Sequence, residues 1–340
     1  DDFNGTIDNK DTYFNYGNAA VLSNPDHKII EEGRENYKEF EINRVLWERP
    51  KLARVENDKN FYASYEIALN MYEVVTIVVK STEQNKDYEF IKRNFEVIEK
   101  SEKPKEINYD VVTKQWDDET QRYYDDTFIN SEHLQFGIFD AMKFTENEKT
   151  LALEKKLDYK FNTLLRYQNI GESPFPMEEM VAAYNEGRTV ELTLQSNRSE
   201  SILYKTLDGT YDEYLTEYAK QVAEFGKPVL FRLNNEMNGD WVYYSTYHNS
   251  KDPELYVKTW QYVHSFFEDA GADNVLWVWN PNHHSKPNFK WNHTLAYYPG
   301  SEYIDIVGLT AYNTGIYHEG EEWTDFETLY DEIYYQYDKW

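Results

Sequence analysis

The stretch PVLFRLNNEMNGDW, residues 228–241, changes from apolar to polar within a few residues. Residues 228–233 have the length and composition of a buried β-strand. Glu236 follows directly among amides, and the ring of Trp241 comes next. A polar cluster at the end of an apolar strand indicates a functional site at the carboxyl edge of a parallel sheet.

The part of the chain after residue 131 repeats this order of strand, loop and helix. Apolar runs bounded by turn residues predict strands at 133–139, 162–170, 188–196, 228–233, 274–279 and 303–309. Apolar periodicity and capping residues predict helices at about 145–158, 176–187, 209–226, 253–270 and 326–340. Strands that alternate with helices at this interval are typical of a parallel sheet built from βα units.

Two architectures contain such units, an open doubly wound sheet and a closed (β/α)8 barrel. No glycine-rich phosphate loop follows the first strand, which argues against a nucleotide-binding open sheet. The predicted strand ends instead carry amides and rings: Gln168-Asn169, Gln195 to Asn197, Asn234 to Asn238, Asn280 with Asn282, and Tyr312-Asn313. In a barrel these ends meet at the catalytic face. We therefore predict an α/β fold, a TIM-type (β/α)8 barrel of which residues 131–340 cover about six βα units.

Residues 1–130 are predicted to form a smaller N-terminal ancillary region of unknown role. Apolar residues at helical spacing between 61 and 79, and again between 88 and 100, predict that this region is mainly helical. The β-branched run at 74–79 leaves two strands possible for the first of these segments. A sugar-binding module, a helical cap on the barrel and an attachment segment all remain open.

The composition narrows the choice of ligand. The net charge of −27 would repel nucleic acids, anionic membranes and acidic polysaccharides, so a neutral substrate fits better. Aromatic residues make up 17% of the chain, and their flat faces suit stacking against sugar rings. The chain has no cysteine, which excludes disulfides and thiol nucleophiles, and no apolar run long enough for membrane insertion. No metal or cofactor is predicted, since the adjacent His283 and His284 rarely converge on one ion.

The residues after the fourth predicted strand have the chemistry that glycosidic bond cleavage requires. Glu236 at the mouth of a barrel can act as a general acid on the leaving oxygen. The neighbouring amides Asn235 and Asn238 can hold hydroxyl groups without adding charge, and Trp241 offers a stacking face. These residue types together predict a carbohydrate-active site around Glu236.

Three segments, in this order, resemble glycoside hydrolase family 26, the β-mannanases and their relatives in the clan of retaining (β/α)8 hydrolases. They are GKPVLFRLNNEMNGDW (226–241), NVLWVWNPN (274–282) and YYPGSEYIDIVGLTAYN (297–313). The resemblance implies that Glu236 is the catalytic acid/base and that Tyr312 orients the nucleophile. The substrate-binding positions that it implies are Asn235, Asn238, Trp241, Trp279 and Asn282.

Two features depart from the family pattern. The mannanases usually carry histidine immediately before the acid, whereas this chain has Asn235. Asparagine is common at that place elsewhere in the clan, where its amide bonds the substrate 2-hydroxyl. The family's nucleophile is a glutamate at the end of the seventh strand, which we expect beyond residue 340. The nearest acids, Glu319, Glu321 and Glu322, lie on the loop after the sixth strand and are not assigned this role.

These observations predict an endo-acting β-glycan hydrolase with a retaining, two-carboxylate mechanism. A β-1,4-mannanase is the first expectation, and mixed-linkage β-glucan (as for a lichenase) and β-1,3-xylan are the other expected substrates. The expected partner is thus a neutral β-linked polysaccharide or oligosaccharide. The alternative is a non-catalytic carbohydrate-binding or capsule-associated protein with a degenerate cleft. We expect a bacterial protein that is secreted or held at the cell surface, although no signal peptide is visible in the given residues.

Overall fold

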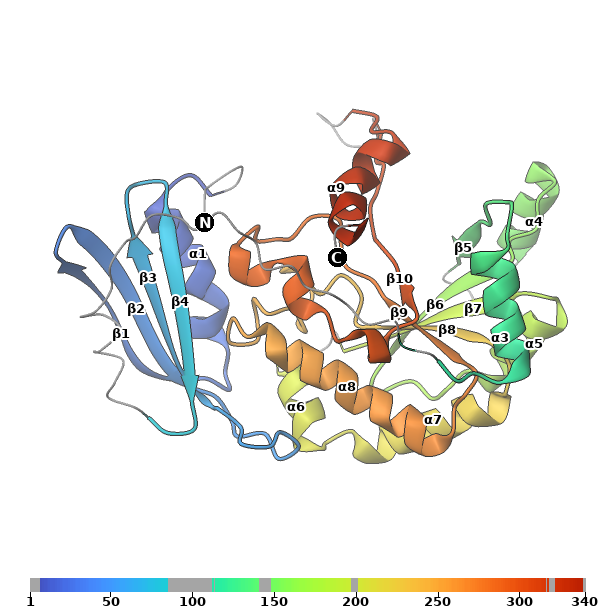
Figure 1. The fold of residues 1–340 in the computed structure, drawn as a ribbon, viewed down its shortest axis with the longest axis horizontal. Helices are drawn as coiled ribbons and strands as arrows, with labels where there is room; N and C mark the ends of the chain where they lie inside the picture. Colours follow the sequence, from blue (N-terminus) through green and yellow to red (C-terminus); the bar gives the residue numbers. More distant parts are fainter. Residues whose placement is uncertain are drawn as a thin grey trace.

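The computed structural model describes residues 7–84, 112, 114–140, 148–196, 201–315, 317 and 322–338, which fold around two β-sheets (Figure 1). One sheet has the strand order β1-β2-β3-β4, and the other has the order β10-β9-β8-β7-β6-β5. The first sheet, drawn in blue, lies at one end of the molecule, and the second lies among the helices at the other end.

The second sheet is parallel throughout and forms a curled half-barrel of the TIM type. Its strands are β5 (Gly137–Phe139), β6 (Thr163–Asn169), β7 (Thr189–Gln195), β8 (Val229–Leu233), β9 (Val275–Trp279) and β10 (Ile306–Val307). Leu192, Phe231 and Trp277 are paired side by side across β7, β8 and β9. The predicted strands and their parallel order are confirmed, while the described residues form half a barrel rather than a closed one.

Helices connect these strands in the order that the sequence predicts. They are α4 (Glu148–Leu157), α5 (Met177–Asn185), α6 (Ile202–Asp208), α7 (Asp212–Phe225), α8 (Pro253–Ala270) and α9 (Phe326–Asp338), with 3-10 turns at Lys290–Asn292, Thr294–Tyr297 and Ser301–Tyr303. The ends of α8 follow from its sequence, because the Asp252 side chain accepts the Glu254 amide hydrogen and Gly271 ends the helix with a φ of +67°. The sequence does not predict the seven-residue α6, since two turns are too short to show an apolar period.

Both faces of the half-barrel strands are covered, as successive side chains of β8 show. Phe231 packs against Tyr218 of α7 and Phe267 of α8, with ring centroids 6.4 and 4.8 Å apart. Leu230 points to the opposite, inner face and packs with Tyr123 of α3 (Asp118–Tyr124). α3 and the π-helical turn after it, η1 (Asp125–Ile129), precede residue 131 in the chain, yet α3 packs on the half-barrel.

The N-terminal region contains an antiparallel sheet, so the prediction of a mainly helical region is wrong. The strands are β1 (Lys28–Tyr37), β2 (Phe40–Glu48), β3 (Phe61–Ala68) and β4 (Val74–Ser81), accompanied by α1 (Lys10–Ser23). Residues four apart, such as Phe61 and Tyr65, share a face in a strand as well as in a helix, which is why the spacing is ambiguous. The helix expected at 88–100 lies outside the described residues. We call α1 and β1–β4 together the sheet unit.

A buried ion pair joins the sheet unit to the half-barrel. The ammonium group of Lys251, just before α8, lies 2.7 Å from Oε1 of Glu66 on β3, and the two side chains are 0% and 1% exposed. Asn18 of α1 accepts from the same ammonium group at 2.7 Å and donates to Oε2 of Glu66 at 2.7 Å. Because a buried charge without a partner costs several kcal/mol, each of these two charges depends on the other while the units are docked.

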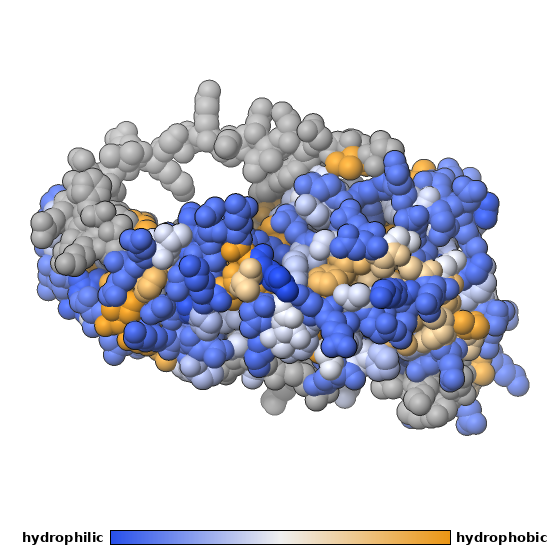
Figure 2. All heavy atoms as spheres, turned by 90° about the horizontal axis from the view of Figure 1, so that it is seen from below, coloured by the Kyte–Doolittle hydropathy of each residue, from blue (hydrophilic) through white to orange (hydrophobic). Residues whose placement is uncertain are grey.

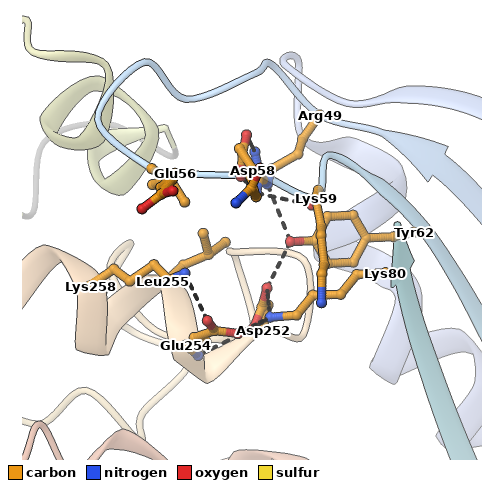
Figure 3. Close-up of a pocket in the computed structure, with 12 residues that line it drawn as sticks. Arg49, Glu56, Asp58, Lys59, Tyr62, Lys80, Asp252, Glu254, Leu255 and Lys258 are labelled. Atoms are coloured by element: carbon orange, nitrogen blue, oxygen red, sulfur yellow. Dashed lines mark hydrogen bonds and ion pairs between the residues drawn. The ribbon is translucent and has the colours of Figure 1, made fainter. Parts of the chain in front are cut away.

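A polar cavity of about 210 Å³ lies between the sheet unit and α8 (Figure 3). At its wall Tyr62 donates to the Asp252 carboxylate at 2.7 Å, and Lys80 pairs with the same carboxylate at 2.9 Å. Arg49 pairs with Asp58 at 2.6 Å within the sheet unit. The contacts of Asp252 therefore connect the start of α8 directly to β3 and β4.

The effects of the Lys251 and Glu66 charges on the free energy of unfolding are expected to be coupled. Glu66→Gln or Lys251→Met leaves one buried charge unpaired and should lower the free energy of unfolding by about 3–5 kcal/mol. The double variant removes both charges and should lose clearly less than the sum of the two single losses. Urea unfolding of the four proteins measures this coupling, and additive losses would contradict it.

His27 lies between α1 and β1, and its neutral imidazole ring contacts the half-barrel. Its Nδ1 lies 3.0 Å from the Val21 carbonyl oxygen, and its Nε2 lies 2.8 Å from the Tyr204 hydroxyl of α6. Nδ1 therefore donates to the carbonyl, and Nε2 accepts from the hydroxyl. Burial of the ring lowers the pKa of His27 to about 4.

This lowered pKa predicts that the stability of the protein falls in mildly acidic solution. Between the ordinary value of 6.5 and about 4, the unfolded chain binds a proton on His27 that the folded protein excludes. The loss of stability should reach about 2–3 kcal/mol at the acidic end. His27→Gln removes this titration, so the difference in unfolding free energy between parent and variant should shrink as the pH falls. A difference that stays constant with pH would contradict the prediction.

The surface is largely polar on the face that Figure 2 shows. Figure 2 shows one face of the molecule, which is mostly hydrophilic with apolar residues in separate smaller patches. None of the described helices combines the length and the apolarity that a membrane span requires.

Candidate active site

The chain reverses sharply where β8 ends, and this reversal presents Glu236. Asn234 and Glu236 have positive φ angles of +47° and +57°, which are uncommon for residues other than glycine. Hydrogen bonds to both neighbouring strand ends hold the turn. The Ser196 amide donates to the Asn234 side chain at 2.9 Å, and the Glu236 amide donates to the Asn280 carbonyl at 2.7 Å. Backbone strain of about 1–3 kcal/mol per residue is typical of functional sites.

Trp241 holds the carboxylate of Glu236 by a hydrogen bond. Its indole Nε1 donates to Oε2 of Glu236 at 2.9 Å. Trp241 is 46% exposed, while Glu236 is half-buried. A carboxyl group and an open aromatic face thus lie side by side, which is the combination that a general acid and a sugar platform need.

Gly239 makes room for this indole. A Cβ atom at position 239 would lie 2.4 Å from the ring atoms Cε2 and Cζ2 of Trp241. A side chain at this position therefore requires the ring to move.

Gly239→Ala is expected to displace the Trp241 ring and to break its hydrogen bond to Glu236 while the fold is kept. Gly33→Ala in β1 is the matched control, because a Cβ atom there meets no described atom within 4 Å. Crystal structures of both variants measure the position of the indole. If the Trp241 ring does not move in Gly239→Ala, the prediction is wrong, and the close approach of the new Cβ atom to the ring is relieved by another shift.

Tyr312, the second predicted catalytic residue, lies close enough to Glu236 to feel its charge. Burial, and then the negative charge of Glu236, raise the pKa of the Tyr312 phenol. The residue is still 67% exposed, so its hydroxyl is accessible. Trp241 thus bonds Glu236 directly, and Tyr312, which follows β10, lies within reach of the Glu236 charge.

Arg232 is a site residue that the sequence analysis does not identify. It lies on the inner face of β8, where Nη2 donates to the Tyr167 hydroxyl at 2.9 Å and Nη1 donates to Asn280 Oδ1 at 2.8 Å. It also bonds Thr193 at 2.8 Å and pairs with Glu191 at 3.1 Å. The sequence does carry one signal for this residue, because Arg232 is the single charge inside an apolar strand. A buried guanidinium must have polar partners, so such a charge predicts a polar network around it. Arg232 fixes side chains from three other segments below Glu236.

Two predicted substrate-binding amides occupy different environments. The Asn235 residue is 6% exposed, and its side-chain oxygen has no hydrogen-bond partner among the described residues. Asn238 is fully buried, and its side chain bonds the backbone of Asn282 in both directions at 2.8 Å. Its Nδ2 also donates to Ser285 and Thr294, each at 3.2 Å. Asn238 therefore holds the loops after β8 and β9 together.

The predicted residues at the end of β9 also face the protein. Trp279 is 0% exposed, and its ring packs edge-on against Tyr298 with centroids 5.4 Å apart. Asn282 is 7% exposed, and its side-chain oxygen accepts the His284 amide hydrogen at 3.1 Å. Both side chains are thus buried in this structure.

No metal site accompanies these groups in the part of the chain that the structure describes. There, no three histidine, aspartate or glutamate side chains are grouped so that they could hold an ion.

Comparison with known proteins gives matches over parts of this chain. A profile of glycosyl hydrolase family 26 matches residues 176–334. A mannan endo-1,4-beta-mannosidase of Bacillus subtilis is 39% identical over 133 residues, which are 37% of this chain and 32% of that protein. Endoglucanase H of Acetivibrio thermocellus is 30% identical over 159 residues, which are 45% of this chain and 17% of that protein. The chain thus spans less than a third of the length of either relative.

Solved structures also match part of this chain. A mannanase of Bacillus subtilis matches with a TM-score of 0.42 and 19% identity, over 58% of this chain and 67% of that one. A β-mannanase of Bacteroides ovatus matches with a TM-score of 0.35 and 19% identity, over 44% of this chain and 51% of that one.

Proposed function

This chain belongs to glycosyl hydrolase family 26 in its residues 176–334, and from this premise we propose that it is an endo-acting hydrolase of a neutral β-glycan. The observation that carries the proposal is the hydrogen bond of 2.9 Å between Trp241 and Glu236. An acid and an aromatic face on one loop can protonate a glycosidic oxygen and hold the sugar beside it. The net charge of −27 supports a neutral polymer as the substrate.

Glu236 is the proposed acid/base of a retaining mechanism. It would protonate the leaving oxygen in the first step and take a proton from the attacking water in the second. The mechanism also needs a second carboxylate about 5–5.5 Å away as the nucleophile. We place that residue on a seventh strand outside residues 1–340, and Tyr312 is the residue proposed to orient it.

Mannan is the first proposed substrate, followed by mixed-linkage β-glucan and β-1,3-xylan. The Bacillus subtilis relative that is 39% identical is named for the hydrolysis of mannan. The resemblance supports a contact of Asn235, immediately before the acid, to the sugar 2-hydroxyl. The residue is 6% exposed and its side-chain oxygen is buried, so this contact requires the side chain to turn toward the sugar.

Glu236→Gln tests the proposed acid/base. In the full-length protein, we expect reducing ends to be released from glucomannan, galactomannan or lichenan, and the variant to be about a thousandfold slower. Glu172→Gln changes an exposed carboxylate on the loop after β6 and should keep the parent rate within about twofold. Equal rates for parent and Glu236→Gln would exclude the assignment.

The same assay separates the enzyme from a non-catalytic carbohydrate-binding or capsule-associated protein. The exposed ring of Trp241 would also serve binding alone. Binding of these glycans without release of reducing ends, unchanged in Glu236→Gln, would favour that second function.

We also propose that this protein works outside a bacterial cell or at its surface. Support comes from the proposed substrate, since polysaccharides do not enter cells intact. Immunodetection in culture medium, cell-wall and cytoplasmic fractions tests this, and a protein confined to the cytoplasm would contradict it.

A further inference from the structure

The loop at 239–252 leads from Glu236 to α8, and its first part rests on the sheet unit. The Tyr16 hydroxyl of α1 donates to Oδ2 of Asp240. Tyr247 in turn donates its hydroxyl to the Tyr16 carbonyl at 3.1 Å, and the two rings lie 5.3 Å apart. Asp240 stands between Gly239 and Trp241, the two residues that set the position of the indole against Glu236.

The rest of the loop is held by the same unit. His248 lies with Nε2 2.7 Å from the Asp240 carbonyl and thereby joins the start of the loop to its middle. The carbonyl of His248 accepts from Asn24 at 3.3 Å, and the Ser250 hydroxyl accepts from the Trp47 indole at 3.0 Å. Lys251 ends the series with its buried pairing to Glu66.

The conformation of the loop makes this support necessary. Ser250 and Lys251 both have positive φ angles, +59° and +53°, and hold them with side chains that are buried against the sheet unit. A backbone in this region persists only where its surroundings fix it. The half-barrel therefore supplies the acid, while α1, β2 and β3 supply contacts that fix the loop after it.

We propose that the sheet unit is a positioning element of the catalytic site, in which Tyr16 fixes Asp240 and thereby the Trp241 indole against Glu236. This inference rests on the proposed function for its catalytic consequence, but the geometry can be tested without activity. It gives residues 7–84 a role in the site that differs from an independent sugar-binding module or an attachment segment. Burial, and then the hydrogen bond to Asp240, raise the pKa of Tyr16, so its phenol stays protonated and remains a donor.

The first test reads the indole itself in the full chain labelled with ¹⁵N at the tryptophan Nε1. Nine tryptophans give the indole signals, and Trp241→Phe identifies the one that belongs to Trp241. Tyr16→Phe is expected to move that signal and to speed its exchange with water, because the hydrogen bond to Glu236 loosens. Tyr13→Phe is the control on the same helix, since the Tyr13 hydroxyl bonds Thr76 of β4 at 2.5 Å. A Trp241 signal that is identical in parent and Tyr16→Phe overturns the proposal.

The second test measures kinetics on the best substrate of the full-length protein. Tyr16→Phe should lower kcat about tenfold with KM changed less than about twofold, because a misplaced acid slows the chemical step. Asp240→Asn keeps an acceptor for Tyr16 and should retain both the indole signal and kcat. A loss of kcat in Tyr16→Phe with an unmoved indole signal overturns positioning. If the parent has no activity, the proposed function fails, and the indole signal alone still decides whether Tyr16 positions Trp241.

Discussion

The parallel pairing of β7, β8 and β9 brings three strand ends to one edge, and the candidate site depends on this constraint. The reversal at Asn234 and Glu236 is tied to Ser196 on one side and to Asn280 on the other. Without those neighbours the turn would carry unpaired backbone groups in a strained conformation. The acid is therefore presented by the sheet as a whole rather than by its own loop.

Much of the half-barrel can be predicted from the sequence because its local rules agree. Apolar runs, the Asp252 cap and the Gly271 stop all favour the same elements. The sheet unit could not be predicted in the same way, since residues four apart satisfy the helical and the strand pattern at once. Arg232 was missed because its partners, Thr193, Tyr167 and Asn280, come from segments distant in the sequence.

The site itself was predicted in part. A motif tells which residues are near a strand end, and Trp241 does bond Glu236 there while Tyr312 lies within reach of its charge. The direction of a side chain depends on partners from elsewhere in the chain. Asn238 is turned inward by the loop after β9, and the ring of Trp279 is covered by Tyr298. Neither contact is visible in the segment that carries the residue.

The buried ammonium group of Lys251 bears on how such a chain can evolve. Recombination that exchanged the sheet unit for an unrelated module would leave this cation without its counter-charge at a fully enclosed position. A replacement would have to offer an acid at the place of Glu66, or Lys251 would have to change together with it. The exchange of one unit alone therefore carries the energetic cost of a buried, unpaired charge.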